Sequence, residues 1–334
     1  MKQWVITFIF ALTSTTALAT PRIIFDTDFG GDADDLGALA MLNHMHNRGE
    51  CEFVAVANWN NERYSLPAIA AINQYYGNGE IPLGTRKEGL WHGAWQYNKP
   101  LVDALGSPIT AQQTPSTTEM YRRLLSKADD NSITIVTVGP LLNILSLLDS
   151  SADQYSTLDG KRLVEKKVKE FVVMGGQFPK GEWEWNFNGN MPGVTRKVME
   201  KLDVPVIFSG YEVGQAVKTG ESLNQLEKDH PLYIGYRHFS EHAEWMQEQF
   251  DGDISANASY DQTAVLYAVR GLQPYWRLSP KGIATVNDEG GNTWEETAEG
   301  EHRYLILTDA KAATHAVLSA MLGEDTSLNQ TNGE

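Results

Sequence analysis

Short runs of apolar residues alternate along the chain with stretches of helical periodicity. Continuous apolar runs are typical of strands buried on both faces, and apolar residues spaced along one helical face are typical of helices that cover a sheet. Strands are expected at residues 22–25, 53–56, 133–138, 171–174 and 204–208, and helices at 36–47, 65–76, 141–148 and 264–269. This alternation predicts an α/β fold with an open, mostly parallel, Rossmann-like sheet that carries helices on both faces.

The remaining pattern predicts one domain. The sequence shows no repeat, no low-complexity tract and no linker rich in Pro or Ser, so residues 20–334 are expected to fold together. The stretch 221–253 is polar with spaced aromatic residues, and we expect a helical insertion or a lid there. Residues 325–334 are polar and are expected to fray.

The first 19 residues resemble a signal peptide. Lys2 precedes an apolar stretch at 4–12, which is too short for a comfortable transmembrane span. The sequence Ala17-Leu18-Ala19 has the small-residue pattern of a signal-peptidase site. We therefore expect cleavage after Ala19, no stable membrane anchor, and a mature protein that is periplasmic or secreted.

The charge of the chain disfavours nucleic acid as a partner. The chain has 27 Lys and Arg residues against 43 Asp and Glu residues, a formal net charge of −16. An excess of this sign repels polyphosphates, and no basic run offsets it, so nucleic acid is not an expected partner. The single cysteine, Cys51, excludes an intramolecular disulfide and a metal site built from several cysteines.

The residues that follow the first expected strand are unusually acidic, at a position where open α/β sheets bind ligands. Residues 26–35 read Asp-Thr-Asp-Phe-Gly-Gly-Asp-Ala-Asp-Asp, with five carboxylates in ten positions. A polar turn before a helix explains part of the cluster, because each carboxylate at a helix N-terminus gains roughly 0.3–1 kcal/mol. Two carboxylates about 4 Å apart repel by roughly 4 kcal/mol at an effective dielectric of about 20. The cluster therefore indicates a bound hard cation, Ca²⁺ or Mg²⁺.

Two other acidic motifs fit this segment less well. An EF-hand loop that starts at Asp26 requires a Glu where Gly37 stands, and it follows a helix rather than a strand. A phosphatase of the haloacid type begins with Asp-x-Asp after a first strand, but has Thr or Val where Gly30 stands. The phosphatase stays a minor alternative.

The acidic segment and further motifs in the same order resemble the inosine-uridine nucleoside hydrolase family. The resemblance covers about residues 22–320 and is that of a divergent, exported bacterial branch. Besides Asp-Thr-Asp-x-Gly and the Asp-Asp pair, the matching motifs are Asn58 after the second strand, Val-Gly-Pro-Leu-Leu-Asn at 138–143, Val-Val-Met-Gly-Gly at 172–176, Glu-Trp-Asn at 184–186 and Tyr-Asp at 260–261.

The resemblance implies a nucleoside hydrolase fold and hydrolysis of the N-glycosidic bond of ribonucleosides to free base and ribose, with one Ca²⁺ per subunit. It implies that Asp28 is both a metal ligand and the base that deprotonates the attacking water. Further implied ligands are Asp35, Asp261, the backbone carbonyl of Val138 and, more weakly, Asp32, with Asp34 as the alternative to Asp32. The implied substrate contacts are Asp26, Asn58, Met174, Glu184, Asn186 and Tyr260. Relatives often form dimers or tetramers, so a homo-oligomer is one expectation.

The sequence departs from the family pattern at two points. Tyr260 stands where one branch has a His that helps to protonate the leaving base, and Glu212 lies in a segment unlike that of well-studied members. The replacement acids considered are Tyr260 itself, His92, His238 and His242, and the aromatic residues considered for base stacking are Trp183, Trp185 and Trp245. Two alternatives therefore stay open: a non-catalytic periplasmic binder of ribosides or sugars, and a hydrolase of another glycosyl compound.

Overall fold

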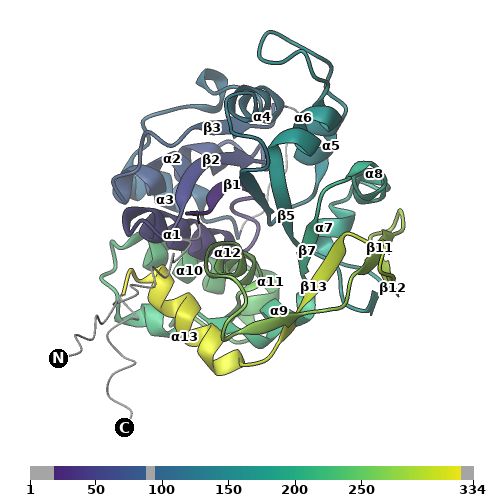
Figure 1. Ribbon diagram of the computed structural model, residues 1–334. Coiled ribbons are helices and arrows are strands. Elements are labelled where there is room, and N and C mark those ends of the chain that lie inside the picture. Colours follow the sequence, from purple (N-terminus) through teal and green to yellow (C-terminus); the bar gives the residue numbers. More distant parts are fainter. Residues whose placement is uncertain (1–18, 88–94, 325–334) are drawn as a thin grey trace, which may run out of the picture.

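The strands form one large twisted sheet with helices packed against both faces (Figure 1). The computed structural model describes residues 19–87 and 95–324. In spatial order the strands are β3 (Leu83–Thr85), β2 (Glu52–Asn58), β1 (Arg22–Thr27), β4 (Ile133–Thr137), β5 (Val168–Met174), β7 (Val206–Ser209), β13 (His302–Leu307), β11 (Gly282–Val286), β12 (Asn292–Glu296) and β6 (Lys180–Gly181). The first seven strands in this spatial order, from β3 across to β13, pair in parallel with one another. This confirms the predicted α/β class.

An antiparallel edge extends the parallel part of the sheet. Strands β11, β12 and β6 pair antiparallel with their neighbours, and β10 (Trp276–Leu278) pairs antiparallel with β13. The sequence pattern missed this edge because β11 alternates buried and exposed residues instead of forming a continuous apolar run. A separate two-stranded ribbon joins β8 (Lys218–Thr219) to β9 (Asn257–Ala258).

Each face of the sheet has its own hydrophobic cluster. Successive residues of β1 point to opposite faces, so Ile23 and Phe25 pack in one cluster and Ile24 in the other. The first face is covered by α1 (Asp34–Asn47), α2 (Ser65–Tyr75), α3 (Asn98–Leu105), α10 (Pro231–His242), α12 (Tyr260–Arg270) and α13 (Ala310–Met321). The second is covered by α4 (Thr117–Leu125), α5 (Leu142–Leu148), α6 (Gly160–Lys167) and α8 (Val194–Lys201).

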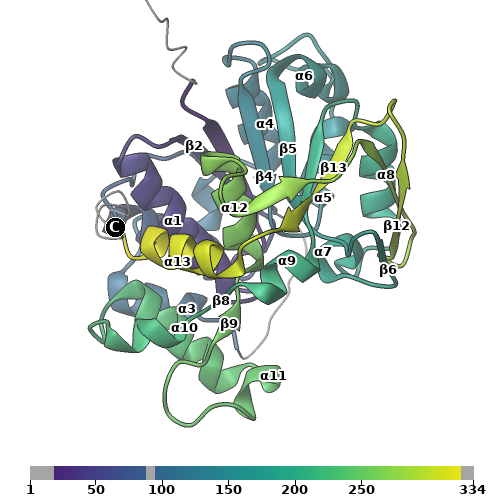
Figure 2. The same cartoon turned by 60° about the horizontal axis from the view of Figure 1, so that its bottom comes forward.

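The polar stretch 221–253 is helical. It forms η2 (Glu221–Gln225), α10 and α11 (Glu244–Gln247), at the bottom of the view in Figure 2. The remaining short elements are η1 (Ala111–Gln113), α7 (Trp185–Asn188) and α9 (Tyr211–Ala216). No helix within residues 19–87 and 95–324 is long and apolar enough to cross a membrane. The expected signal peptide, apart from Ala19, and the expected frayed tail lie outside the described residues.

A buried arginine fixes the loop between α5 and α6. The side chain of Arg122, on α4, is only 2% exposed. Its guanidinium donates to the two carboxylate oxygens of Asp153 at 2.7 and 2.9 Å, and to Ser150 Oγ at 2.9 Å. It also donates to the carbonyl oxygens of Ser156 and Leu158. These bonds join one helix to a loop that has little apolar packing of its own.

We expect Arg122→Met to destabilise the protein by about 3 kcal/mol, because it removes five hydrogen bonds of a buried guanidinium, two of them to the Asp153 carboxylate. Urea denaturation followed by circular dichroism measures the free energy of unfolding. Lys281→Ala is the control, because its ion pair with Glu301 is exposed and worth less than about 1 kcal/mol. An equal, small effect of both substitutions would show that the Arg122 bonds add nothing to stability.

Candidate active site

A cavity of about 630 Å³ lies at the carboxyl ends of the central strands. Asp28 follows β1, Val138 follows β4, Met174 ends β5 and Tyr211 follows β7. The described lining residues comprise six carboxylates, six aromatic residues and six others. They are Asp28, Asp32, Asp34, Asp35, Glu184 and Asp261; Trp95, Trp183, Trp185, Trp245, Tyr211 and Tyr260; and Gly31, Val138, Met174, Gln177, Asn186 and Asn190.

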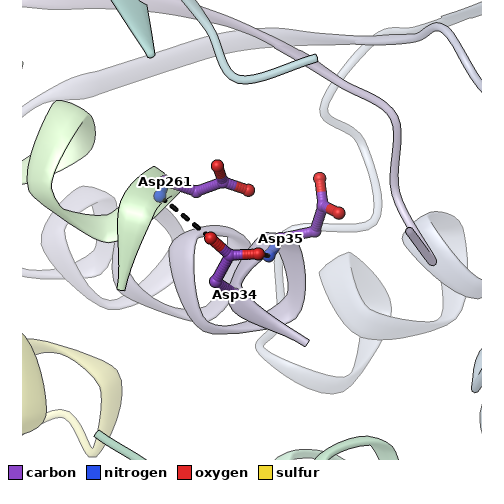
Figure 3. A group of neighbouring side chains, drawn as sticks. All are labelled: Asp34, Asp35 and Asp261. Carbon is purple, nitrogen blue, oxygen red and sulfur yellow. Dashed lines mark hydrogen bonds between the residues drawn. The ribbon is translucent and has the colours of Figure 1, made fainter. Parts of the chain in front are cut away.

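Three buried carboxylates meet in this cavity. Asp34 and Asp35 open α1, and Asp261 lies in the first turn of α12, so residues distant in sequence come together (Figure 3). One oxygen of each lies within 4.8 Å of the others. The two oxygens of Asp34 accept hydrogen bonds from the backbone N–H groups of Asp261 and Asp35, at 3.2 and 3.1 Å. The hydroxyl of Thr27 donates to Asp35 Oδ1.

Burial and mutual repulsion make these carboxylates costly to ionise. Burial, and then the neighbouring carboxylates, hold the pKa of Asp34, Asp35 and Asp261 well above the usual range. The N-terminal ends of α1 and α12 favour negative charge here, but by only roughly 0.3–1 kcal/mol per group. The donors are all oxygen atoms, which fits a hard divalent cation. The sequence did not decide whether Asp32 or Asp34 faces the metal. In the structure it is Asp34 that lies with Asp35 and Asp261.

Asp28 and Asp32 line the cavity beside this group. Asp28 Oδ2 accepts a hydrogen bond from the indole N–H of Trp185 at 3.2 Å. Asp32 Oδ1 accepts from the side-chain amide of Asn257 at 2.6 Å and from the backbone N–H of Ala33. Burial raises the pKa of both carboxyl groups to about 6.

Asn186 joins the ends of β4 and β5. Its amide donates to the carbonyl oxygens of Val138 and Met174, at 3.0 and 3.2 Å, and contacts Met174 Sδ at 3.0 Å. All three residues line the cavity. The Val138 carbonyl is thus held by Asn186 in the cavity wall, and its role as a metal ligand stays a prediction.

Glu184 is fixed by the backbone. It caps α7, where its oxygens accept from the N–H groups of Asn186 and Phe187, and it also accepts from Gly176, each at 3.0 Å. Burial raises its pKa to about 7 despite these three donors. Glu184 thus presents a buried carboxyl group to the cavity with little freedom to move.

Tyr260 lies in the wall of the cavity. Its hydroxyl donates to Gln215 Oε1 at 2.6 Å, and its ring stacks on Tyr211 with 5.2 Å between centroids. Burial raises its pKa. His238 and His242 lie on α10, stack on one another and do not line the cavity, and His92 lies outside the described residues.

Asp26 and Asn58 do not line the cavity. Both oxygens of Asp26 accept from other side chains, the hydroxyl of Tyr121 at 2.7 Å and the amide of Asn143 at 3.0 Å. Burial raises the pKa of Asp26 to about 7. Asn58 is fully buried, and its amide contacts Ser65 and the backbone carbonyl of Asn60. In the structure these two residues hold the loops behind the cavity, so a direct sugar contact stays a prediction.

The sequence analysis missed several lining residues. Tyr211 follows a strand end, so the rule that identified Asp28 could have found it. Trp95 carried no such signal, because it precedes α3 and reaches the cavity from another layer, where its indole N–H donates to the carbonyl of Gly31 at 2.8 Å. Gln177 and Asn190 also lay in loops without a pattern.

Known proteins share this fold and its sequence pattern. The chain is 27% identical over 112 residues to the pyrimidine-specific ribonucleoside hydrolase RihA of Escherichia coli O1:K1, and this match covers 33% of the chain and 32% of the relative. The chain therefore matches about a third of that curated relative's length. Two solved structures share the fold. The plant nucleoside hydrolase PpNRh1 superposes with a TM-score of 0.66 at 16% identity, over 90% of this chain and 99% of that chain. The inosine-uridine preferring nucleoside hydrolase of Bacillus anthracis superposes with a TM-score of 0.60 at 14% identity, over 91% of this chain and 99% of that chain.

The family assignment depends on a longer match than either of these. The sequence model of the inosine-uridine preferring nucleoside hydrolases matches residues 23–316, which include each strand of the parallel sheet apart from the first residue of β1, and both helices that supply the buried carboxylates. The chain belongs to the inosine-uridine preferring nucleoside hydrolase family.

Proposed function

We propose that this protein is an exported, calcium-dependent hydrolase that cleaves the N-glycosidic bond of ribonucleosides to give the free base and ribose. The observation that carries the proposal is the group of three buried carboxylates, Asp34, Asp35 and Asp261, in a cavity that also contains Asp28. Burial of like charges in one place is costly unless a cation is held there. The resemblance of residues 1–19 to a signal peptide supports a periplasmic location, where free calcium is more plentiful than in a cytoplasm.

The residues present fit such an ion. Asp28, Asp35 and Asp261 would hold it together with the carbonyl of Val138, and Asp34 belongs to the same group of oxygens. When bound, the ion lowers the pKa of a coordinated water and orients the hydroxyls of the ribose. Calcium fits the all-oxygen donor set and tolerates irregular geometry better than magnesium does.

In this proposal Asp28 takes the proton from the attacking water. Its carboxylate lies in the cavity wall, and the indole N–H of Trp185 fixes the direction of one oxygen. In the overall step a bond forms between the water oxygen and C1′ of the ribose, and the bond from C1′ to the base nitrogen breaks. The bond's electron pair leaves with the base, and the water proton goes to Asp28.

The rest of the cavity favours the electron-poor sugar that forms as the base departs. By analogy with other glycosyl transfers, the transition state resembles an oxocarbenium ion. The fixed carboxylate of Glu184 and the sulfur of Met174 lie in the wall beside Asn186. Buried carboxylates interact more strongly with developing positive charge than they do in water.

The substrate should be unphosphorylated. Among the described lining residues there are six carboxylates and no Lys, Arg or His. A phosphate group would meet like charges at close range. The cavity therefore suits ribosides rather than nucleotides.

Base release from a panel of purine and pyrimidine ribonucleosides, followed by chromatography, tests the proposal. We expect release in calcium, none after chelation, and at least about a hundred-fold lower kcat/KM for the 5′-monophosphates, which corresponds to roughly 2.7 kcal/mol of repulsion. Calcium-dependent binding of ribosides without release would instead favour the non-catalytic binder. Release from monophosphates at the same rate would contradict the charge argument.

Replacing the proposed base should abolish most turnover without unfolding the protein. Asp28→Asn keeps the shape of the side chain but cannot accept the proton, so kcat should fall roughly 10²–10⁴-fold at saturating calcium. Asp229→Asn, at an exposed position outside the cavity, is the matched control and should leave kcat unchanged. Full activity of Asp28→Asn would assign the proton transfer to another group.

Calcium should stabilise the protein more at pH 8 than at pH 5.5. Burial raises the pKa of Asp28 to about 6 and holds that of Asp35 and Asp261 well above the usual range. The folded, metal-free protein therefore binds more protons than the unfolded chain above pH about 4, and its stability falls as the pH rises through this window. The ion competes with those protons for the carboxylates, so calcium binds more tightly and stabilises the fold more at the higher pH.

Thermal unfolding with and without saturating calcium measures this dependence. The calcium-induced rise in Tm should be largest at pH 8 and should shrink steadily toward pH 5.5. A rise that is the same at every pH would mean that the ion is bound elsewhere.

A further inference from the structure

Four of the aromatic residues of the cavity form two contacting pairs, and three of its rings are well exposed. Trp95 and Trp245 contact edge to face with 5.3 Å between centroids, and Tyr211 stacks on Tyr260 at 5.2 Å. Trp183 and Trp245 are each 52% exposed and Tyr211 is 38% exposed, although all three line a cavity. Large exposed rings gathered in one place indicate a binding surface for a planar group.

The same cavity is lined by acidic side chains. The described residues that line it include six carboxylates but no cationic side chain, so one bound divalent ion leaves an excess of negative charge. The faces of Trp and Tyr rings also attract cations, most strongly when the cation is removed from water. Rings and carboxylates together therefore favour a planar ligand that carries positive charge.

The described residues that line the cavity include no His, Lys or Arg that could protonate a departing base. The hydroxyl hydrogen of Tyr260 is donated to Gln215 at 2.6 Å. Both oxygens of Glu184 accept from backbone N–H groups. A neutral base that leaves without a proton departs as an anion, which six carboxylates disfavour.

We propose that the preferred substrates are ribosides of cationic heteroaromatic bases, that is, ribosylated pyridinium rings or N-alkylated purines. The inference rests on the proposed function and adds the class of its leaving group. Water adds to C1′ and the bond from C1′ to the positively charged ring nitrogen breaks. The bond's electron pair stays on that nitrogen, so the base leaves neutral and needs no acid, and the water proton goes to Asp28.

A binding experiment measures the effect of ligand charge apart from bond cleavage. Isothermal titration of the calcium-loaded protein with 1-methylnicotinamide, a cation, and with nicotinamide, its neutral counterpart, compares two rings of nearly the same shape. We expect the cation to bind at least about ten-fold more tightly. Trp245→Leu should remove most of this difference and Trp245→Phe should keep part of it. Tyr75→Leu, an exposed ring on α2 outside the cavity, should change neither affinity.

A turnover experiment tests the leaving group. We expect kcat/KM for nicotinamide riboside to exceed that for inosine and uridine by at least about a hundred-fold. The cationic base leaves without an acid, whereas the neutral bases of inosine and uridine need one. Trp245→Leu should lower kcat/KM for nicotinamide riboside more than for inosine.

The outcomes distinguish this inference from the function on which it rests. Equal affinity for the two nicotinamides, or faster turnover of neutral ribosides, overturns the preference for cations and leaves the hydrolase standing. Absence of turnover for every riboside contradicts the hydrolase, and the binding comparison then decides alone whether the cavity selects positive charge.

Discussion

The repulsion among buried carboxylates is the constraint on which the site depends. Asp34, Asp35 and Asp261 approach within 4.8 Å, with Asp28 and Asp32 in the same cavity wall. A pair about 4 Å apart costs roughly 4 kcal/mol at an effective dielectric of about 20, more than a helix N-terminus returns. The fold holds these groups together because a parallel sheet brings its strand ends, and two helix starts, to one edge.

The layer behind the cavity keeps the acidic loop in place. Asp26 is held by Tyr121 and Asn143, so the segment between β1 and α1 starts from a fixed point. Gly139 allows the chain after β4 to pass close by, since a Cβ there would lie 2.8 Å from the backbone nitrogen of Asp28. A site that binds an ion and aims a base needs such support, because small displacements of the reacting groups are costly.

The sequence predicted the parts of the structure that follow simple rules, and missed those that depend on packing between layers. Apolar runs located β1, β2, β4, β5 and β7, and the strand-end rule identified the acidic loop. The antiparallel edge escaped because β11 alternates buried and exposed residues and its neighbours β6 and β10 are short. Trp95 escaped because it lies in a loop before α3, where no strand end marks it. The meeting of Asp34 and Asp35 with Asp261 depends on the packing of α12 against α1.

Calcium binding to metal-free protein, measured by isothermal titration calorimetry, would show whether the buried carboxylates form a metal site. We expect one ion per chain in the native protein, and loss of that binding in Asp261→Asn, which removes a charge that only the folded structure brings beside Asp34 and Asp35. Absence of calcium binding, or binding unchanged in Asp261→Asn, would show that the buried carboxylates do not form the metal site.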